Sequence, residues 1–306
     1  ACEIAVSGRH NLLMIGPPGA GKTMIARRIP GILPEMTEEE ALEVTKIYSV
    51  RGLLTESEAW MAERPFRNPH HTITPQGLAG GGMVPGPGEI SLAHHGVLFL
   101  DELAEFRRET LEILRQPMEE HCVKLARLAG NYEFPSDFML VAAMNPCRCG
   151  YYPDLNRCHC TKGMVEQYLK KISQPLLDRI DICVETKRVE YQDLIKENPH
   201  QETSAEIRKR VVAAMERQQQ RFAGTNIRYN SRIPAALLTK YCRLSTKQKQ
   251  YMENIYQKLE LTARSYHRIL RVARTIADMD GSDEILTRHL SEAVCYRNVD
   301  KKFWEG

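Results

Sequence analysis

The feature that most constrains this chain is a short apolar run followed by a glycine-rich loop near its beginning. Residues 11–23 read N-L-L-M-I-G-P-P-G-A-G-K-T, and the last eight have the spacing G-x-x-x-x-G-K-T of a phosphate-binding loop between a buried strand and a helix. Glycines without a Cβ let successive backbone N–H groups approach phosphate oxygens. The lysine adds charge for the outer phosphates, and the threonine hydroxyl can ligate Mg²⁺. We therefore expect ATP or ADP to bind at Gly16, Pro17, Pro18, Gly19, Ala20, Gly21, Lys22 and Thr23.

A second segment places two carboxylates at the end of a strand-like run. Residues 97–102 read V-L-F-L-D-E, and a buried parallel strand delivers its last residues to the sheet edge where ligands bind. We expect Asp101 to hold Mg²⁺ through water, and Glu102 to orient and deprotonate the attacking water. The alternative is a core strand that ends in a solvated acidic turn. Together with Lys22 and with Thr23 as a second Mg²⁺ ligand, the acidic pair predicts ATP hydrolysis.

A third apolar run ends in a polar amide. Residues 138–144 read F-M-L-V-A-A-M, which predicts another buried strand, and Asn145 follows it directly. An amide in this position can hydrogen-bond the attacking water or the γ-phosphate. Asparagine before proline is also a common turn residue. The place of Asn145 after a core strand favours the catalytic interpretation.

Length and composition bound the class of protein. The 306 residues and 42% hydrophobic content are enough for about two domains with genuine cores. The formal net charge of +3 neither requires nor excludes nucleic acid, so any basic surface must be local. No apolar run approaches the roughly 18 residues of a membrane span, and no secretory signal pattern is present. We expect a cytoplasmic protein with no membrane partner, in which the nine cysteines are reduced or bind metal.

Four of the nine cysteines fall in one polar segment that follows Asn145. Two C-x-C pairs separated by eight residues supply the four thiolates of a closed structural Zn²⁺ site. The alternative is a loop of free thiols, or one that forms a disulfide after oxidation. The single residue within each pair is tighter than the commoner spacing of two to four. We expect zinc at Cys147, Cys149, Cys158 and Cys160.

Residues 64–96 are rich in proline and glycine, which excludes a long regular helix. We expect an ordered excursion or a mobile loop between the two nucleotide motifs. The pairs His70-His71 and His94-His95 are not expected to bind metal. Adjacent histidines should point in divergent directions, and neither pair has a carboxylate or thiol neighbour in the sequence.

Capping signals place several helices. Thr37 with Glu40, and Thr203 with Glu206, have the spacing of a capping box, so helices should start after each threonine. Residues 262–279 predict a further helix with one apolar side, which Gly281 closes.

Three longer motifs resemble those of a known family. They are R-P-F-R-N-P-H-H at residues 64–71, P-G-E-I-S-L-A-H-H-G-V-L-F-L-D-E-L at residues 87–103 and L-L-D-R-I-D-I at residues 176–182. They are similar to motifs of the Mg-chelatase-type AAA+ ATPases, most of all the ComM/YifB branch of Mg-chelatase-like proteins, and the similarity runs over essentially the whole chain. It implies an AAA+ P-loop NTPase with an α/β core of αβα layers around a parallel sheet and a C-terminal α-helical lid domain. It also implies a homo-oligomer, a hexameric ring.

The resemblance suggests a domain division. We expect residues 1–188 to form the nucleotide-binding core, with the Pro/Gly-rich insert at 64–96, a hairpin at 122–134 and the cysteine loop at 147–160. Residues 189–306 would form the lid. Members of this branch typically carry a further, Lon-like N-terminal domain, so we expect this chain to be a piece of a longer protein.

The resemblance also assigns roles that local patterns leave open. Asn145 matches the residue called sensor 1 in AAA+ proteins. Arg179, which by itself could be a surface ion pair of little energetic value, matches the arginine finger that reaches into the neighbouring subunit's site. Arg264 matches the arginine that begins the lid helix and contacts the γ-phosphate, with Arg268 as the fallback. The alternative is a solvated basic stripe of Arg264, Arg268 and Arg271.

The segment from residue 122 to residue 134 predicts a β-hairpin around Gly130-Asn131. Taken alone, such a hairpin is more often structural than functional. In the proteins it resembles, a hairpin at this point projects into the channel of the ring and grips DNA. On that basis Lys124 and Arg127 are expected to contact DNA phosphates.

Three functions are compatible with these observations. The leading one is an ATP-driven DNA translocase or helicase that promotes branch migration in recombination or natural transformation, as the resemblance implies. The second is a chelatase-like ATPase that remodels a partner protein. The third, a module that binds nucleotide without turnover, is disfavoured by the presence of Glu102 and Arg179.

Overall fold

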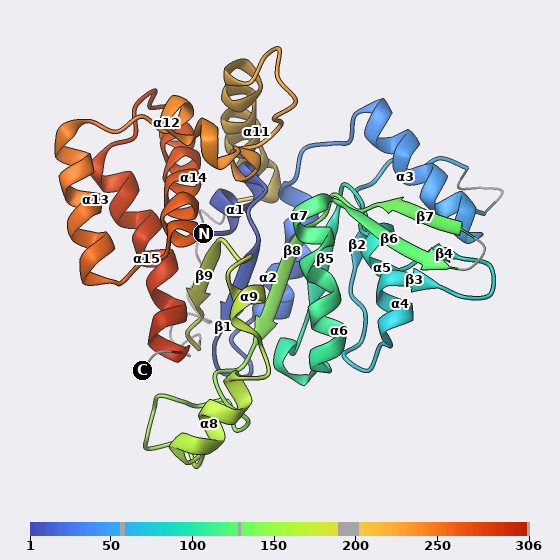
Figure 1. Cartoon of the computed structure of the whole chain (residues 1–306), viewed down its shortest axis with the longest axis horizontal. Coiled ribbons are helices and arrows are strands. Elements are labelled where there is room, and N and C mark those ends of the chain that lie inside the picture. The colour runs from blue at the N-terminus through green and yellow to red at the C-terminus, as the bar shows by residue number, and fades with distance from the viewer. Residues whose placement is uncertain (56–58, 128–129, 189–201, 305–306) are drawn as a thin grey trace.

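A parallel β-sheet forms the centre of the computed structural model, which describes residues 1–55, 59–127, 130–188 and 202–304 (Figure 1). The order of its five strands is β2-β5-β8-β1-β9, and every neighbouring pair is parallel. The strand order reverses beside β1, because the chain builds β2, β5 and β8 on one side of β1 and then crosses to β9 on the other. Such a reversal marks the ligand-binding edge of open α/β sheets. The strands are Leu12–Ile15 (β1), Phe66–Arg67 (β2), Val97–Leu100 (β5), Met139–Met144 (β8) and Ile182–Glu185 (β9).

Alternate side chains of these strands enter two apolar cores. Leu12 and Met14 pack into one core with α1 and the C-terminal helices, whereas Leu13 and Ile15 pack into the other. Successive residues of a strand point to opposite faces, so a strand covered on both faces must be apolar throughout. The α/β parallel core expected from the continuous apolar runs is confirmed.

Four helical elements of the first 51 residues pack around the sheet. The α3 helix starts after Thr37, whose side chain accepts from the backbone of Glu40 while the Glu40 carboxylate accepts from the backbone of Thr37, so the predicted capping box is confirmed. These elements are Cys2–Gly8 (α1), Lys22–Arg28 (α2), Ile29–Ile32 (η1) and Glu38–Arg51 (α3).

The Pro/Gly-rich insert is an ordered excursion. It contributes β2 to the edge of the main sheet, and short elements continue from there to β5 (Figure 1). A small antiparallel pair, β3 with β4, lies between two short helices. The elements after β2 are Pro75–Ala79 (α4), Gly80–Gly81 (β3), Gly86–Pro87 (β4) and Glu89–Leu92 (α5).

The predicted hairpin is present, but its turn was misplaced. Asn131 pairs with Ala126, and Gly130 pairs with Arg127, so both residues expected in the turn belong to the second strand. Residues 128–129, between the strands, lie outside the described ranges. This middle part of the chain contains Leu103–Glu105 (η2), Arg108–Glu112 (α6), Ile113–Arg115 (η3), Pro117–Glu120 (α7), Cys122–Arg127 (β6), Gly130–Pro135 (β7), Lys162–Leu169 (α8) and Gln174–Leu177 (α9).

After β9, the described residues 202–304 form helices and their connecting loops. In Figure 1, α12, α13, α14 and α15 lie at the left of the sheet and α11 lies at the top. The α11 helix begins at the predicted Thr203–Glu206 capping box, and α14 begins after Thr262, as expected. Both helices pack against α1, while α15 packs along β9. None of the helices in the described ranges is long and apolar enough to cross a lipid bilayer. The helices are Ser204–Arg221 (α11), Asn230–Arg232 (η4), Ala235–Leu237 (η5), Leu238–Tyr241 (α12), Thr246–Lys258 (α13), Ala263–Met279 (α14) and Thr287–Trp304 (α15).

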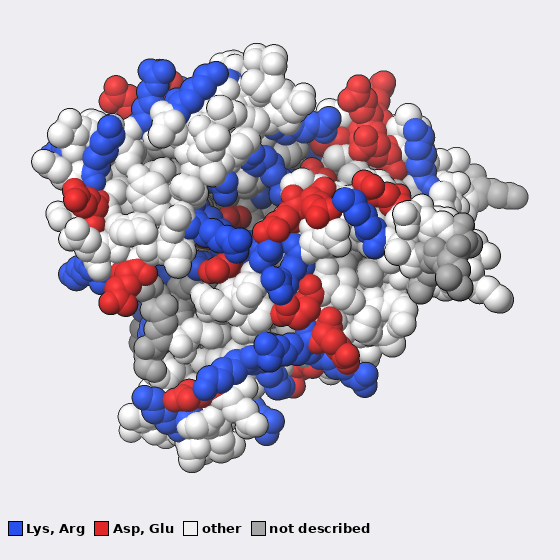
Figure 2. Space-filling model, in the orientation of Figure 1, with Lys and Arg blue, Asp and Glu red and all other residues white. Residues whose placement is uncertain are grey.

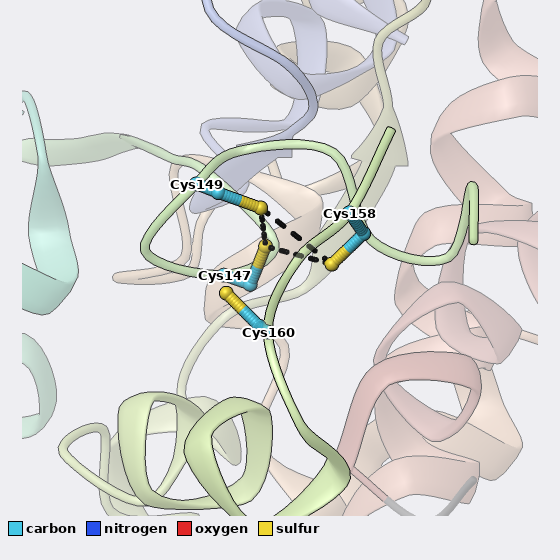
Figure 3. Close-up of side chains that lie close together, drawn as sticks. All are labelled: Cys147, Cys149, Cys158 and Cys160. Carbon is cyan, nitrogen blue, oxygen red and sulfur yellow. Dashed lines mark hydrogen bonds between the residues drawn. The ribbon is translucent and has the colours of Figure 1, made fainter. Parts of the chain in front are cut away.

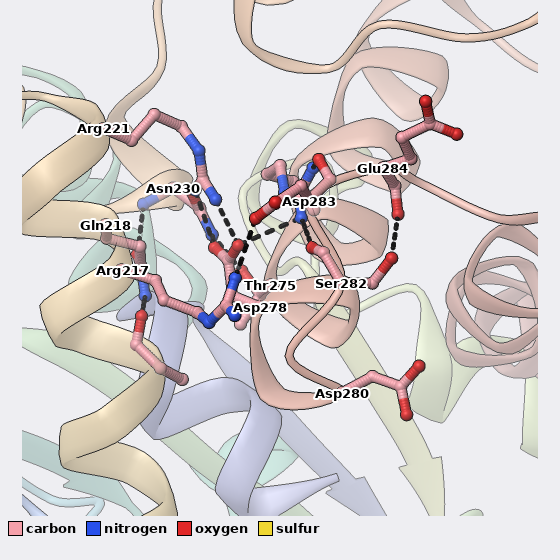
Figure 4. A network of polar contacts seen from close by, with 12 residues as sticks. Arg217, Gln218, Arg221, Asn230, Thr275, Asp278, Asp280, Ser282, Asp283 and Glu284 are labelled. Atoms are coloured by element: carbon pink, nitrogen blue, oxygen red, sulfur yellow. Dashed lines mark hydrogen bonds and ion pairs between the residues drawn. The ribbon is translucent and has the colours of Figure 1, made fainter.

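A buried polar network ties these helices to one another and to α1 (Figure 4). The Asp278 carboxylate on α14 accepts hydrogen bonds from Arg221 on α11 at 2.7 Å and from the Asn230 amide at 2.8 Å. One helical turn before Arg221, Gln218 donates to the backbone carbonyl of Ser7 at 2.7 Å. Because these buried groups are paired, the network fixes the helices relative to the first helix of the core.

Candidate nucleotide site

The phosphate-binding loop lies at the carboxyl end of β1, between β8 and β9. Gly19 and Gly21 both adopt φ of +76°, a conformation that favours glycine, and α2 begins immediately afterwards at Lys22. A Cβ on Gly16 would lie 2.1 Å from Thr186 Oγ1, because the chain leaving β9 passes directly against the loop. The predicted strand–loop–helix arrangement is therefore formed, with its backbone N–H groups at the start of a helix.

Lys22 is buried at the centre of this loop. Its Nζ donates to the carbonyls of Gly16 at 2.7 Å and Pro17 at 2.9 Å, and to Asn145 Oδ1 at 3.1 Å. Burial lowers the pKa of Lys22, and the Asp101 carboxylate opposes that shift. The contact with Asn145 brings the end of β8 to the phosphate loop, as the position of Asn145 after a core strand indicated.

Thr23 on α2 meets Asp101, which follows β5. Thr23 Oγ1 donates to Asp101 Oδ2 at 2.6 Å, which joins the first turn of α2 to the end of β5. A hydroxyl and a carboxylate oxygen this close are hard oxygen donors, which Mg²⁺ prefers. The residues present therefore fit the Mg²⁺ site expected from the sequence.

Glu102 adopts an unusual backbone conformation beside this pair. Its φ is +52°, in the left-handed region that non-glycine residues rarely occupy, and its side chain is 59% exposed. A backbone held in this conformation is characteristic of functional sites. His71 Nδ1 lies 3.3 Å from Glu102 Oε2. This contact was not predicted, because His71 was weighed only as a metal ligand. The family-like motif at residues 64–71, which contains His71, was the sequence feature that could have pointed to this residue.

The four loop cysteines converge on one point (Figure 3). Cys147 Sγ lies 3.3 Å from Cys149 Sγ and 3.8 Å from Cys158 Sγ, and all four sulfur atoms, Cys160 included, lie within 4.8 Å of one another. A tetrahedral zinc with bonds of about 2.3 Å separates its sulfur ligands by about 3.8 Å, so the donor set fits a Zn(Cys)₄ site.

The thiols of this cluster differ in their pKa values. Burial acts to raise the pKa of Cys149, but hydrogen bonds from the Tyr151 backbone and from Cys147 lower it to about 6. Burial raises the pKa of Cys158 to about 12, so the four thiols do not ionise alike. The same loop touches the nucleotide site. A Cβ on Gly150 would lie 2.5 Å from Pro18 Cδ, so the cysteine loop packs directly against the phosphate loop.

Arg179 lies at the opposite edge of the sheet. It follows α9 and precedes β9, and its backbone carbonyl accepts from the Asn11 side chain, at the amino end of β1. The phosphate loop and Asp101 lie at the carboxyl ends of the strands. The structure therefore does not bring Arg179 to Lys22 within one protomer.

The other lid arginines have different environments. Arg264 is exposed at the start of α14, whereas Arg268, one turn later, is buried and donates to the carbonyls of Leu177 and Ile180. Arg271 donates to the carbonyl of Ile233 at 2.9 Å. The alternative of a solvated basic stripe is wrong for Arg268 and Arg271, which hold backbone carbonyls. Arg268 donates to carbonyls on both sides of Arg179, so the first turns of α14 lie near the amino edge of the sheet.

The candidate DNA-contacting hairpin is described only in part. Lys124 is half exposed on β6, and its Nζ lies 2.7 Å from Glu120 Oε2. The side chain of Arg127 lies outside what the structure describes.

His94 and His95 were expected to point apart and to lack a carboxylate neighbour, and both expectations are wrong. The rings of His94 and His95 lie 3.9 Å apart, and both approach the same Glu43 oxygen, at 3.0 and 2.7 Å. His94 Nδ1 accepts from the backbone N–H of Asp137, so its Nε2 carries the proton and donates to Glu43. That nitrogen has no lone pair free for a cation. The three side chains form a hydrogen-bonded cluster that joins α3 to the segment before β5.

Two family models match the chain. The model described as magnesium chelatase, subunit ChlI, matches residues 1–194, and the one described as magnesium chelatase, subunit ChlI C-terminal, matches residues 201–297. The curated relatives include the uncharacterized protein YifB of Escherichia coli (strain K12), 45% identical over 299 residues, which cover 98% of this chain and 58% of that protein. The competence protein ComM of Haemophilus influenzae is 43% identical over 297 residues, 97% of this chain and 57% of that protein. The chain thus spans less than two thirds of the length of these relatives.

Proposed function

The chain belongs to the magnesium chelatase subunit ChlI family, whose members are AAA+-type ATPases, and from this premise we propose that it is a ring-forming motor that hydrolyses ATP at sites shared between neighbouring copies. One observation carries the proposal. The phosphate-binding residues and acids meet at the carboxyl edge of the sheet, whereas Arg179 lies at the amino edge. A finger arginine placed there can serve only the site of another copy.

Within each site, we assign the chemistry to residues at the ends of β1, β5 and β8. The phosphate loop and Lys22 hold the phosphates, and Thr23 and Asp101 would hold Mg²⁺, which offsets the phosphate charge when bound. The Glu102 carboxylate accepts the proton of the attacking water, and Asn145 orients that water or the γ-phosphate. No covalent bond to the protein is required.

The neighbouring copy completes the site. Arg179 stabilises the negative charge on the transferring phosphoryl group. Arg264 is exposed one helical turn before Arg268, which donates to the carbonyl of Ile180, and we propose that Arg264 reaches the same phosphate. This division of labour requires a closed ring, for which we propose six copies, each with a core at residues 1–188 and a lid at residues 189–306.

We propose a structural Zn²⁺ at the four loop cysteines. Its support is the convergence of four sulfur atoms within 4.8 Å. The loop is positioned to brace the phosphate loop through the Gly150–Pro18 contact, so the metal would act on nucleotide binding through packing and not through catalysis.

We propose DNA as the polymer on which the motor acts, in branch migration during recombination or natural transformation. The relative named competence protein ComM supports this choice. Although the formal net charge is only +3, Figure 2 shows basic side chains gathered in a band above α8, so positive surface is local. Lys124 and Arg127 of the hairpin are the proposed phosphate contacts.

The second candidate is a chelatase-like ATPase that remodels a protein partner, which the family name favours. ATP turnover with and without duplex or branched DNA at moderate salt separates the two. The motor proposal requires that DNA stimulate turnover and that a labelled four-way junction migrate in an ATP-dependent manner. Unstimulated turnover together with a static junction would refute DNA as the substrate.

The hairpin assignment has its own test. Arg127→Ala should weaken DNA binding and reduce the slope of log affinity against log salt by about one. An unchanged affinity and slope would remove Arg127 from the DNA contacts.

A further inference from the structure

Each of the three nitrogens of the Arg179 guanidinium contacts a partner within its own protomer. Its Nε donates to the carbonyl of Arg115 at 3.2 Å, Nη1 donates to the carbonyl of Pro175 at 2.6 Å, and Nη2 lies 2.5 Å from Glu119 Oε1. Its side chain is only 10% exposed, whereas that of Glu119 is 54% exposed. Three of the five N–H donors of the guanidinium are used in this way, and the contact with Glu119 holds its charge against a carboxylate of its own protomer.

Buried hydrogen bonds fix the backbone on either side of Arg179. Arg268 on α14 and Arg297 on α15 both donate to the carbonyls of Leu177 and Ile180, on either side of Arg179. Both arginines are buried, and Arg297 also pairs with Asp178 at 3.3 Å. Movement of the Arg179 segment would break several buried contacts, so the side chain is the part free to change position.

Among the partners of Arg179 in the described part of the chain, Glu119 is the one with a charged side chain in contact. It stands at the C-terminal end of α7, on the wall of a hollow of about 630 Å³ that Arg179, Arg115 and Lys124 also line. A phosphate that enters this hollow from another copy would meet the Arg179 guanidinium and also the Glu119 carboxylate, which is negatively charged like the phosphate. The carboxylate and the phosphate therefore compete for Arg179 Nη2.

We propose that Glu119 is a positioning residue that keeps Arg179 withdrawn in the isolated protomer and releases it when the neighbouring copy presents its nucleotide phosphate. This inference rests on the proposed role of Arg179 as a trans-acting finger. Release from Glu119 then links catalysis to assembly, because an unassembled protomer keeps its finger neutralised.

The test measures ATP turnover per chain against protein concentration, with kcat and KM, for Glu119→Gln. Removing the negative charge leaves the two backbone contacts and frees Nη2. The protein concentration at half-maximal turnover should fall about two- to fivefold, the range of a partly exposed ion pair, with KM for ATP unchanged. Glu119→Asp, which keeps the carboxylate, should return this concentration toward that of the unmodified chain.

Glu120→Gln is the matched control. Glu120 is the next residue on the same helix but pairs with Lys124 and Gln116, so its substitution should leave the concentration dependence unchanged. A Glu119→Gln chain with unchanged concentration dependence, or with kcat lowered, would overturn the proposal. Arg179→Ala distinguishes the finger proposal from the Glu119 proposal. Full turnover in Arg179→Ala would refute the finger role itself. Loss of turnover in Arg179→Ala, together with an unchanged concentration dependence in Glu119→Gln, would refute only the role of Glu119.

Discussion

The amide oxygen of Asn145 lies 3.1 Å from Lys22 Nζ, which joins the end of β8 to the first residue of α2. The contact exists because β1 and β8 are parallel neighbours, with Ile15 opposite Met144. Residues that follow neighbouring parallel strands must share one edge of the sheet, so the amide is placed where phosphate chemistry would occur.

Substitution of this amide should separate catalysis from binding. Asn145→Ala is expected to lower kcat by about tenfold or more, since a polar group aimed at the reacting phosphate is lost, while the affinity for ATP changes little. Single-turnover hydrolysis and nucleotide titration measure the two effects. Asn226→Ala, at an exposed asparagine before η4, serves as the control. Undiminished kcat would exclude a catalytic part for Asn145.

The shared site predicts complementation between two inactive variants. Glu102→Gln lacks the base and Arg179→Ala lacks the finger, so each alone should lose about three orders of magnitude in turnover. In a ring assembled from equal amounts of both, about a quarter of the sites have an intact base facing an intact finger. Mixing should therefore restore about a quarter of the original turnover. If the mixture stays as inactive as its components, both residues act within one chain.

The cysteine cluster predicts that metal and nucleotide binding are linked. Reduced protein should contain one zinc per chain by elemental analysis, and Cys149→Ser with Cys158→Ser should lose it. Because the loop packs on Pro18 through Gly150, loss of the metal should also weaken ATP binding. Cys295→Ser, at an exposed cysteine of α15, should change neither property. Less than half a zinc per chain would argue against the site.

Asp181 predicts a specific loss of stability in acid. Burial acts to raise the pKa of its carboxyl, but His10, whose Nδ1 lies 3.7 Å away, the charge of Arg268 and the backbone N–H of Asn11 lower it to about 2. A depressed carboxyl pKa stabilises the fold above the unfolded value of about 3.9, and this contribution is lost as pH falls through the folded value. The loss should amount to about 2 kcal/mol between pH 4 and pH 2.

Denaturant unfolding across that pH range checks the assignment. Asp181→Asn should be less stable at pH 5 but should show a shallower dependence on pH. Asp283→Asn, at a carboxylate that is 96% exposed, should keep the original dependence. If Asp181→Asn has the same slope as the unmodified chain, the acid sensitivity has another origin.

Local patterns anticipated the features that depend on neighbours in sequence. The runs that became β1, β5 and β8 are apolar throughout because each strand is covered on both faces, and the polar groups at their ends are the site. The two threonine capping boxes were predictable because their hydrogen bonds span three residues. The same Ser-x-x-Gln signal at Ser245 and Gln248 was available for α13 and was missed.

Contacts between distant segments were not predictable in the same way. His71 beside Glu102, and the histidine pair around Glu43, depend on how the insert folds back over the core. The hairpin turn was misplaced because Gly130 and Asn131 have turn propensity, while the cross-strand register assigns them to β7. Burial of Arg268 could not be separated from exposure of Arg264 because both lie on one helical face.

The sequence by itself determined the chemistry: a phosphate loop, two acids, an amide and four thiols, each recognisable because side-chain type and short spacing specify what a group can bind. Only the tertiary structure decided where these groups lie. It placed Lys22 and Asp101 at one edge of the sheet and Arg179 at the other, and it paired Arg179 with Glu119. Strand order and packing set those positions, and both arise from contacts among residues far apart in the chain.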